Sequence, residues 1–227
     1  MFGLLILNKP SGLTSRDVVN RVQRLVKPHK VGHAGTLDPL ACGVLVVCLG
    51  PATRLIEYVQ RMPKRYLATF LLGRQSETED TEGIVAELVD APVPTESQIR
   101  AALPSFIGTI QQLPPAFSAL KVEGKRAYEL ARQGETPDLK PRPIEVYSID
   151  LIEYSYPQLT LDIRCGSGTY VRSLGRDIAR TLGTEAVMSA LSRTEIGPFH
   201  LSNALSGDDI SPQSIDRSIL PPQSALG

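Results

Sequence analysis

One carboxylate of this 227-residue chain stands in a segment whose composition favours a shaped loop. Asp38 lies within Gly32-His-Ala-Gly-Thr-Leu-Asp-Pro-Leu-Ala-Cys-Gly43, just before the apolar run Val44–Leu49, which is typical of a buried strand. Pro39 disfavours helical geometry at Asp38, and the glycines of the segment allow tight turns and a close approach of the backbone to a ligand. The segment therefore predicts a carboxylate at the entrance of a buried strand, available either for chemistry or for hydrogen bonds to its own turn.

A second group of chemically capable residues begins at Gly166-Ser-Gly-Thr-Tyr-Val-Arg172. It leads into a predicted helix over 170–182, with an apolar stripe and, on another face, arginines at i, i+4 and i+8. Those arginines are Arg172, Arg176 and Arg180. With the free N–H groups at the helix start they would suit phosphates, although an ordinary solvated basic face fits the same spacing. Tyr66, which follows Lys64-Arg65, is either a strand core residue or a residue that stacks on a base.

Familiar cofactor and metal motifs are missing from the sequence. A dinucleotide-binding fingerprint fails because Val171 stands where its third glycine would be, and no Gly-Lys-Ser/Thr phosphate loop exists. His29 and His33 have the spacing of a zinc pair, but Pro28 and Gly32 disfavour the helix that such a pair needs. The three cysteines lack CxxC spacing, which predicts neither a disulfide framework nor a zinc ribbon. We therefore expect no cofactor, no bound metal and a reducing, cytoplasmic setting.

Charge is unevenly distributed, although 24 Lys and Arg balance 24 Asp and Glu. Residues 1–74 hold eleven basic and three acidic side chains, a net charge of +8, whereas residues 75–138 carry −6 and residues 139–227 carry −2. A basic third of this kind fits either a solvated face or a surface that binds a polyanion. No apolar run reaches the roughly 20 residues of a membrane span, and Lys9-Pro10 interrupts the N-terminal run too early for a signal peptide.

The elements expected to position these residues form a mixed series. Strands are expected at 2–7, 44–49, 66–72, 84–89, 144–153 and 158–165. Helices are expected from a cap at Thr14 or Ser15 to Pro28, over 52–60, from a cap at Thr95 to about Leu103, near 128–132 and over 170–182. Because strict βαβ alternation is missing, we expect an α+β fold in which helices flank a mostly antiparallel or mixed sheet. The catalytic domain is expected to span 1–205, and the Ser- and Pro-rich composition of 206–227 predicts a poorly packed tail.

Several motifs, in the right order, are similar to those of the TruB family of bacterial tRNA pseudouridine synthases. They are Lys9-Pro-Ser-Gly-Leu-Thr-Ser15, the segment Gly32–Gly43 quoted above, Lys64-Arg-Tyr66, Gln112-Leu-Pro-Pro-Ala-Phe-Ser-Ala-Leu-Lys121 with Tyr128-Glu-Leu-Ala-Arg132, and Gly168-Thr-Tyr-Val-Arg-Ser-Leu174. The resemblance extends from about Leu4 to Phe199. It implies the pseudouridine synthase fold, with an active-site cleft across the sheet. It also implies a cofactor-free isomerase that converts a uridine of the TΨC loop of tRNA, at tRNA position 55, into pseudouridine.

The same resemblance implies a catalytic set of three residues. Asp38 would act at the ribose of a uridine extruded from its loop, as a nucleophile at C1′ or as a base at C2′. Arg172 would keep this carboxylate ionised in a water-poor pocket, because an arginine stays charged and can grip a carboxylate with two donors. Tyr66 would stack on the uracil and is a candidate for moving the C5 proton.

Contacts to the RNA substrate are implied as well. The residues expected to make them are His33, Tyr170, Leu191, Lys9, Lys64 and Arg176. Leu191 would close the other face of the base pocket, Tyr170 would line it, and His33 would help to hold the flipped-out loop. Lys9 is expected either to support the Asp38 loop or to contact a phosphate.

Departures from the family pattern concern RNA binding. Phe117 replaces a frequent tyrosine and Ser167 a frequent lysine, which removes a hydrogen bond and a phosphate contact. Many members also carry a C-terminal PUA domain, for which a chain ending at Gly227 has no room. We therefore expect the short form of the family, a monomer that acts on tRNA without a guide RNA. Guide-RNA-dependent pseudouridine synthases share the aspartate motif but are expected to bring that domain.

Two other function classes fit part of the sequence. An RNA-binding or RNA-folding module without turnover would not need the set of Asp38, Tyr66 and Arg172, so the presence of all three favours an isomerase. A glycosidase-like hydrolase would need a second carboxylate as general acid. The acidic segment 77–82 is the candidate for that group, although no paired-carboxylate motif is present. The acidic middle of the chain is expected to face away from the RNA.

Overall fold

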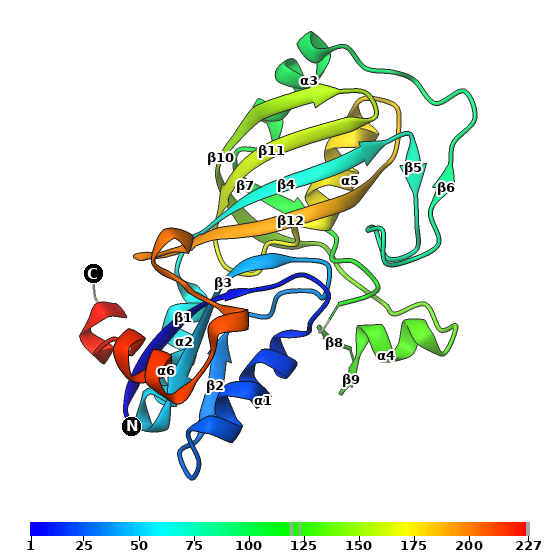
Figure 1. Ribbon diagram of the computed structural model, residues 1–227. Helices are drawn as coiled ribbons and strands as arrows, with labels where there is room; N and C mark the ends of the chain where they lie inside the picture. Colours follow the sequence, from blue (N-terminus) through cyan, green and yellow to red (C-terminus); the bar gives the residue numbers. More distant parts are fainter. Residues whose placement is uncertain (119, 123, 226–227) are drawn as a thin grey trace. The chain divides into compact units, whose positions relative to one another are not determined.

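The computed structural model describes residues 1–118, 120–122 and 124–225 (Figure 1). These residues form two compact units. The first unit comprises residues 1–67 together with those from 191 onward, and the second unit comprises residues 68–190. Two strands, β4 (Lys64–Leu72) and β12 (Ala186–Ile196), contribute residues to both units. Among the helices of the described ranges, none combines the length and the apolar character that a membrane crossing requires.

The first unit is built on strands β14-β1-β3-β12, in that order. Strand β1 pairs antiparallel with β3 and parallel with β14, while β12 pairs parallel with β3 at Ser192↔Cys42 and Arg193↔Gly43. Short strands β2 and β13 pair antiparallel with β3 and β12. The strands of this unit are β1 (Gly3–Lys9), β2 (Val31–Ala34), β3 (Cys42–Leu49), β13 (Phe199–His200) and β14 (Leu205–Ser206), with the ends of β4 and β12. Its helices and 3-10 turns are α1 (Ser15–Leu25), η1 (Gly50–Leu55), α2 (Ile56–Arg61), η3 (Leu201–Asn203), η4 (Gly207–Asp209), α6 (Pro212–Ser218) and η5 (Pro222–Ala225).

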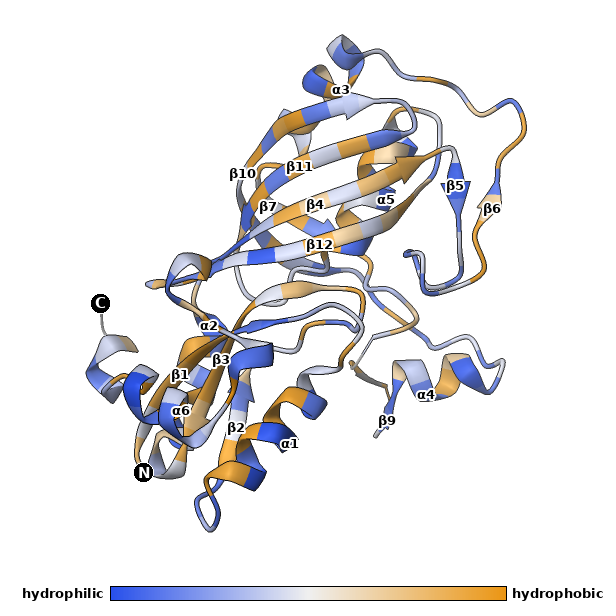
Figure 2. Cartoon of the chain, in the orientation of Figure 1, coloured by the Kyte–Doolittle hydropathy of each residue, from blue (hydrophilic) through white to orange (hydrophobic). Residues whose placement is uncertain are grey.

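Both faces of this first-unit sheet are buried, which explains the uninterrupted apolar runs of β1 and β3. Leu5 and Leu7 of β1 face a core cluster that includes Val18 and Val22 of α1 and Ile215 of α6. The alternate residues of β1 face a second cluster formed with η1, α2 and the end of β12. Figure 2 shows the apolar residues concentrated along β1 and β3, and a helix α1 with one apolar and one polar side.

The second unit contains strands in the order β12-β4-β11-β10-β7. Strand β10 pairs antiparallel with both β11 and β7. The elements confined to this unit are β5 (Arg74–Gln75), β6 (Ala86–Glu87), α3 (Glu96–Ala102), η2 (Leu103–Phe106), β7 (Gly108–Gln112), β8 (Lys121–Val122), β9 (Lys125–Arg126), α4 (Ala127–Arg132), β10 (Arg142–Ser155), β11 (Gln158–Cys165) and α5 (Val171–Thr181). Parallel and antiparallel pairs therefore coexist with flanking helices, which confirms the expected α+β class with a mixed sheet. The predicted cleft across the sheet stays a prediction.

Local sequence signals account for most element boundaries. Thr14 caps α1 in a capping box with Asp17, and Thr95 caps α3 in the same way with Gln98. The predicted strands at 2–7, 44–49, 66–72, 144–153 and 158–165 and the predicted helices near 128–132 and over 170–182 are confirmed within a few residues. Over 52–60 the predicted helix is in part wrong, because the chain first forms the 3-10 turn η1, with Pro51 at its start, and then α2.

Three sequence expectations are wrong. Residues 84–89 do not form a full strand: only β6 pairs, with β5, and Ile84 is almost fully exposed. The segment 32–43 is not wholly a loop, because residues 31–34 pair with β3 as β2. A strand needs a hydrogen-bonding partner, and neither outcome can be read from composition.

The third wrong expectation is the poorly packed tail. Ile210 and Ile215 are buried in the core of the first unit, and α6 is capped by Ser211. Leu220 exchanges two backbone hydrogen bonds with Leu4, with N···O distances of 2.7 and 2.9 Å. A few well-spaced apolar residues thus dock a segment whose overall composition is polar. Leu226 and Gly227 of this segment lie outside the described residues.

Packing of α5 on β4 depends on Gly175. A Cβ atom at this position would lie 2.0 Å from Cε1 of the buried Phe70 ring. Gly175→Ala is expected to lower the free energy of unfolding by about 1–3 kcal/mol, because overpacking outweighs the gain of roughly 1 kcal/mol in helix propensity. Urea denaturation measures this change. Phe70→Leu in the Gly175→Ala background is expected to restore part of the loss. A Gly175→Ala protein as stable as the wild type would contradict the close packing.

Candidate active site

The Asp38 loop connects β2 to β3 in the first unit and is braced by the segment that precedes α1. Ser15, at the start of α1, donates through Oγ to the Leu37 carbonyl (3.1 Å) and accepts from the Leu37 N–H (2.9 Å). Ser11 Oγ donates to the Leu40 carbonyl (2.8 Å). The loop closes on itself through a hydrogen bond from Ala41 N to the Asp38 carbonyl (3.1 Å). Residues on both sides of Asp38 are therefore held by hydrogen bonds, and those to Leu37 are buried.

Lys9 braces the same loop from the end of β1. Its side chain is fully buried, and Nζ donates to the carbonyls of Pro10 (2.8 Å), Leu13 (2.6 Å) and Pro39 (3.4 Å). Of the two roles expected for Lys9, support of the Asp38 loop fits this geometry. A direct contact to a phosphate does not fit it, because the ammonium group is turned inward.

Three further predicted site residues of this unit lie on β4 and β12, namely Lys64, Tyr66 and Leu191. Along the start of β4, Lys64 and Tyr66 are buried and alternate with the exposed Arg65. The Lys64 ammonium is buried and donates to the Gln60 carbonyl, and this burial argues against the expected RNA contact. Tyr66 and Leu191 are each 8% exposed, as expected for residues that line a pocket or a core.

His33 of β2 is half-buried, and its Nδ1 atom is buried with no hydrogen-bond partner among the described residues. Burial lowers the pKa of His33, and the positive charges of Arg16 and Arg193 lower it further. An unpartnered imidazole nitrogen beside two arginines is suited to accept a hydrogen bond as the neutral form.

A pH-dependent stability is expected from this histidine. The unfolded chain takes up the proton near pH 6.5, whereas the folded chain needs a lower pH. Between the two pKa values the unfolded state binds more protons, so the free energy of unfolding falls as the pH is lowered below about 6.5. Urea denaturation at a series of pH values from about 8 to 5 measures this dependence. His33→Gln is expected to flatten it, and an unchanged slope in that variant would contradict the assignment.

In the second unit, Arg172 of α5 is buried and held by the acidic segment that follows β5. Its guanidinium donates to the carbonyls of Thr78 (2.7 Å) and Phe117 (3.1 Å) and forms an ion pair with Asp80 at 3.3 Å. Asp80 is itself 2% exposed and accepts from Thr78 Oγ1 (2.5 Å) and Glu82 N (3.1 Å). Sequence reasoning considered 77–82 only as a candidate source of a general acid and did not predict Asp80 as a partner of Arg172.

Arg176, one turn further along α5, is likewise held by carboxylates and by a backbone carbonyl. It pairs with Glu79 and Asp177 and donates to the Leu113 carbonyl (3.0 Å). Burial raises the pKa of Glu79, while Arg176 and the Ser173 hydroxyl offset part of that shift. Burial by itself would lower the pKa of Arg176, but the hydrogen bond that Arg176 donates to Asp177 and the charge of Glu79 outweigh it and raise that pKa. The alternative of a solvated basic face is thus wrong for Arg172 and Arg176, and the RNA contact expected of Arg176 competes with these partners.

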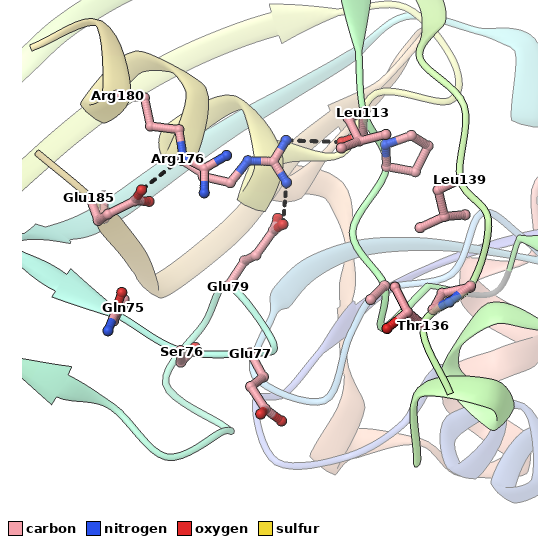
Figure 3. A pocket seen from close by; sticks show the side chains of 14 residues that line it. Gln75, Ser76, Glu77, Glu79, Leu113, Thr136, Leu139, Arg176, Arg180 and Glu185 are labelled. Carbon is pink, nitrogen blue, oxygen red and sulfur yellow. Dashed lines mark hydrogen bonds and ion pairs between the residues drawn. The ribbon is translucent and has the colours of Figure 1, made fainter. Parts of the chain in front are cut away.

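A cavity of about 400 Å³ adjoins this ion pair within the second unit (Figure 3). It is lined by residues of 75–79, 113–116, 136–139 and α5. Figure 3 shows the Arg176 guanidinium between Glu79 and the Leu113 carbonyl, and Arg180 paired with Glu185 (2.9 Å). Both arginines therefore meet carboxylates at the wall of the cavity.

Tyr170, which precedes α5, is fixed by residues from β7 and β10. The fully buried Gln112 makes two hydrogen bonds to the Tyr170 backbone, from Nε2 to O (3.0 Å) and from N to Oε1 (2.9 Å). The Arg142 guanidinium lies over the Tyr170 ring, 4.9 Å from its centroid. Gln112 was missed as a site residue, although it begins one of the motifs on which the family resemblance rests.

The predicted site residues are divided between the two units. The first unit holds Asp38, His33, Tyr66 and Leu191, and the second unit holds Arg172, Tyr170 and Arg176. The expected contact between Asp38 and Arg172 stays a prediction, since the two residues belong to different units. Within the described ranges, no group of three or more His, Cys, Asp and Glu side chains could hold a metal ion.

Comparison with known proteins points to one family. Residues 23–171 match the model of the TruB family pseudouridylate synthase N-terminal domain. A tRNA pseudouridine synthase B of Gluconacetobacter diazotrophicus is 48% identical over 211 residues, which cover 92% of this chain and 69% of that protein. Proteins of the same name from Gluconobacter oxydans and Dehalococcoides mccartyi are 49% and 43% identical, over 92% and 100% of this chain and 63% and 77% of theirs. The chain therefore spans about two thirds to three quarters of the length of these relatives.

Solved structures show the same fold. A Cbf5-Nop10-Gar1 complex contains a chain that matches with a TM-score of 0.75 at 29% identity, over 99% of this chain and 61% of that one. An H/ACA RNP bound to a substrate RNA containing 2'-deoxyuridine matches with the same TM-score at 27% identity and the same coverage. With most of its length matched at this level in both sequence and fold, the chain belongs to the TruB family of pseudouridylate synthases.

Proposed function

We propose that this protein is a tRNA pseudouridine synthase that isomerises the uridine at tRNA position 55, in the TΨC loop. The observation that carries the proposal is the Asp38 loop, in which Lys9, Ser11 and Ser15 hold the backbone on both sides of one carboxylate. Relatives named tRNA pseudouridine synthase B, at 43–49% identity, support tRNA as the substrate. The basic first third of the chain supports a polyanionic partner.

The reaction breaks the N-glycosidic bond of the uridine, turns the uracil over while it is held, and rejoins it to C1′ through C5. In this proposal Asp38 acts at the ribose, as the nucleophile at C1′ or as the base at C2′. Arg172 keeps the Asp38 carboxylate ionised, and its rigid hydrogen bonds to Thr78 and Phe117 orient it for that task. No electron transfer is required, so no cofactor enters the scheme.

The uracil must be gripped while it is detached. We assign this task to Tyr66 and Leu191 on its two faces, with Tyr170 as a further wall. Tyr66 is also the candidate for moving the C5 proton after the C–C bond forms. His33 is proposed to hold the extruded loop. The protein is proposed to act as a cytoplasmic monomer without a guide RNA.

The test is to incubate the protein with an unmodified tRNA transcript and to map pseudouridine at single-nucleotide resolution. Pseudouridine at position 55 alone is the expected result, and a transcript with cytidine at that position should remain unmodified. Pseudouridine elsewhere would overturn the assigned position. Tight tRNA binding without any pseudouridine would favour the alternative, an RNA-binding or RNA-folding module without turnover.

A further inference from the structure

Arg193 of β12 is a buried arginine whose hydrogen-bond partners, within the described residues, are all backbone carbonyls. Its side chain is 2% exposed. Nε donates to the carbonyl of Val44 (2.8 Å), one terminal nitrogen to that of Gly35 (3.0 Å) and the other to that of Thr36 (3.5 Å). A buried charge is costly unless it is well hydrogen-bonded or paired. A neutral apolar side chain would fill the same space at less cost, so packing alone does not explain an arginine here.

The three carbonyls belong to the two ends of the Asp38 loop. Gly35 and Thr36 stand just before Asp38 in the chain, and Val44 stands after it at the entry to β3. One planar guanidinium therefore ties both ends of the loop to a single point on β12. Arginine suits this task because its donors are arranged in a rigid fork, whereas a lysine offers only one nitrogen.

The backbone around Arg193 is equally constrained. Arg193 pairs with Gly43 across the parallel β3–β12 ladder, and a Cβ atom at Gly43 would lie 2.3 Å from the Arg193 carbonyl oxygen. Gly35 has φ of +93°, and a Cβ atom there would lie 3.4 Å from the Arg193 guanidinium. The Asp38 loop and the start of β3 thus pack closely against both the backbone and the side chain of Arg193. Leu191 lies two positions earlier on the same strand and so on the same face.

We propose that Arg193 is the positioning residue of the Asp38 loop, which sets the distance between the Asp38 carboxylate and the base pocket at Leu191. The proposal rests on the proposed function, in which Asp38 acts at a ribose and Leu191 contacts the base. Misplacing a reactive group by about 1 Å can reduce a rate by roughly 100-fold. Loss of the fork should therefore slow the chemical step while the surfaces that bind tRNA remain in place.

The test compares Arg193→Lys and Arg193→Met with the matched control Arg61→Met, at an exposed arginine of α2 in the same unit. Single-turnover rates and tRNA dissociation constants are measured separately. For Arg193→Lys we expect a rate lower by roughly 10- to 100-fold, with a dissociation constant within about threefold of the wild type. Arg61→Met should keep the wild-type rate. A parallel loss of affinity and rate, or an unchanged rate, would overturn the proposal.

Amide hydrogen exchange of residues 35–41 gives a second readout that does not depend on activity. Both Arg193 variants are expected to speed exchange in this segment and to leave β10 and β11 unchanged. Unchanged exchange at 35–41 would overturn the positioning role even if activity fell. If both variants failed to fold, Arg193 would be a determinant of stability and the proposal would be wrong. A wild-type protein that forms no pseudouridine would instead refute the proposed function, and the exchange experiment would still decide whether Arg193 holds the loop.

Discussion

Asp38→Asn is expected to reduce the rate of pseudouridine formation by roughly 10⁴-fold or more, as the loss of a central catalytic group does in other enzymes. An asparagine amide can neither attack C1′ nor remove a proton from C2′. The substitution keeps the size of the side chain, and the loop bonds from Ser15, Ser11 and Lys9 go to neighbouring backbone groups. These backbone bonds should therefore remain in the variant. Single-turnover conversion of a tRNA transcript measures the rate, and urea denaturation checks the stability.

The matched control is Asp150→Asn, at an exposed position of β10 in the second unit. It should keep the wild-type rate within about twofold, as expected for a surface substitution away from the site. An Asp38→Asn protein that retained most of its activity would show that another group carries the chemistry. The most direct candidate would then be a carboxylate of the acidic segment 77–82.

Asp80→Asn is expected to lower the free energy of unfolding by about 3–5 kcal/mol, because it removes the carboxylate charge from a buried ion pair with Arg172. The ion pair is almost completely shielded, with side chains 6% and 2% exposed. Asparagine has nearly the shape of aspartate, so the loss reports the missing charge and not a cavity. Chemical denaturation of the wild type and the variant measures the difference.

The exposed pair Glu96–Arg100 of α3 provides the control. Its N···O distance, 2.8 Å, is shorter than that of the buried pair, yet both side chains are more than half exposed. Glu96→Gln should cost no more than about 0.5 kcal/mol, since water screens the interaction. Equal losses in the two variants would mean that burial does not set the strength of the Asp80–Arg172 pair. Removing Arg172 as well should cost less than the sum of the two single changes.

Local sequence signals predicted the starts of helices well, because these signals act over short distances. Thr14 with Asp17 and Thr95 with Gln98 begin their helices as expected, because a capping box needs only residues three apart. The error at 84–89 has the opposite cause. That segment has strand-like composition, but it meets only the two residues of β5 as a partner. The residue types of a segment set its propensity to form a strand, whereas its backbone hydrogen bonds need a partner strand from another part of the chain.

The partners of charged residues also depend on parts of the chain that are distant in sequence. The acidic segment after β5 and the arginine row of α5 are about 90 residues apart and look solvated when each is considered alone. In the folded second unit they pair as Asp80 with Arg172 and Glu79 with Arg176. The family resemblance implied an RNA contact for Lys64 and either an RNA contact or support of the Asp38 loop for Lys9, and both ammonium groups donate to backbone carbonyls inside the first unit. A charged residue type does not reveal whether its partner is a solvent molecule, a ligand or the protein itself.

The sequence by itself determined the family and the α+β class, because these follow from ordered motifs and from the pattern of expected elements, and the family resemblance pointed to Asp38 as the carboxylate to be tested. Only the tertiary structure decided what holds that carboxylate in place. Lys9, Ser15 and Arg193 reach the Asp38 loop from β1, from α1 and from β12, which lies more than 150 residues further along the chain. Their contacts are hydrogen bonds to backbone carbonyls, which every residue possesses. Such contacts leave no trace in residue type or spacing, so they become visible only once the chain is folded.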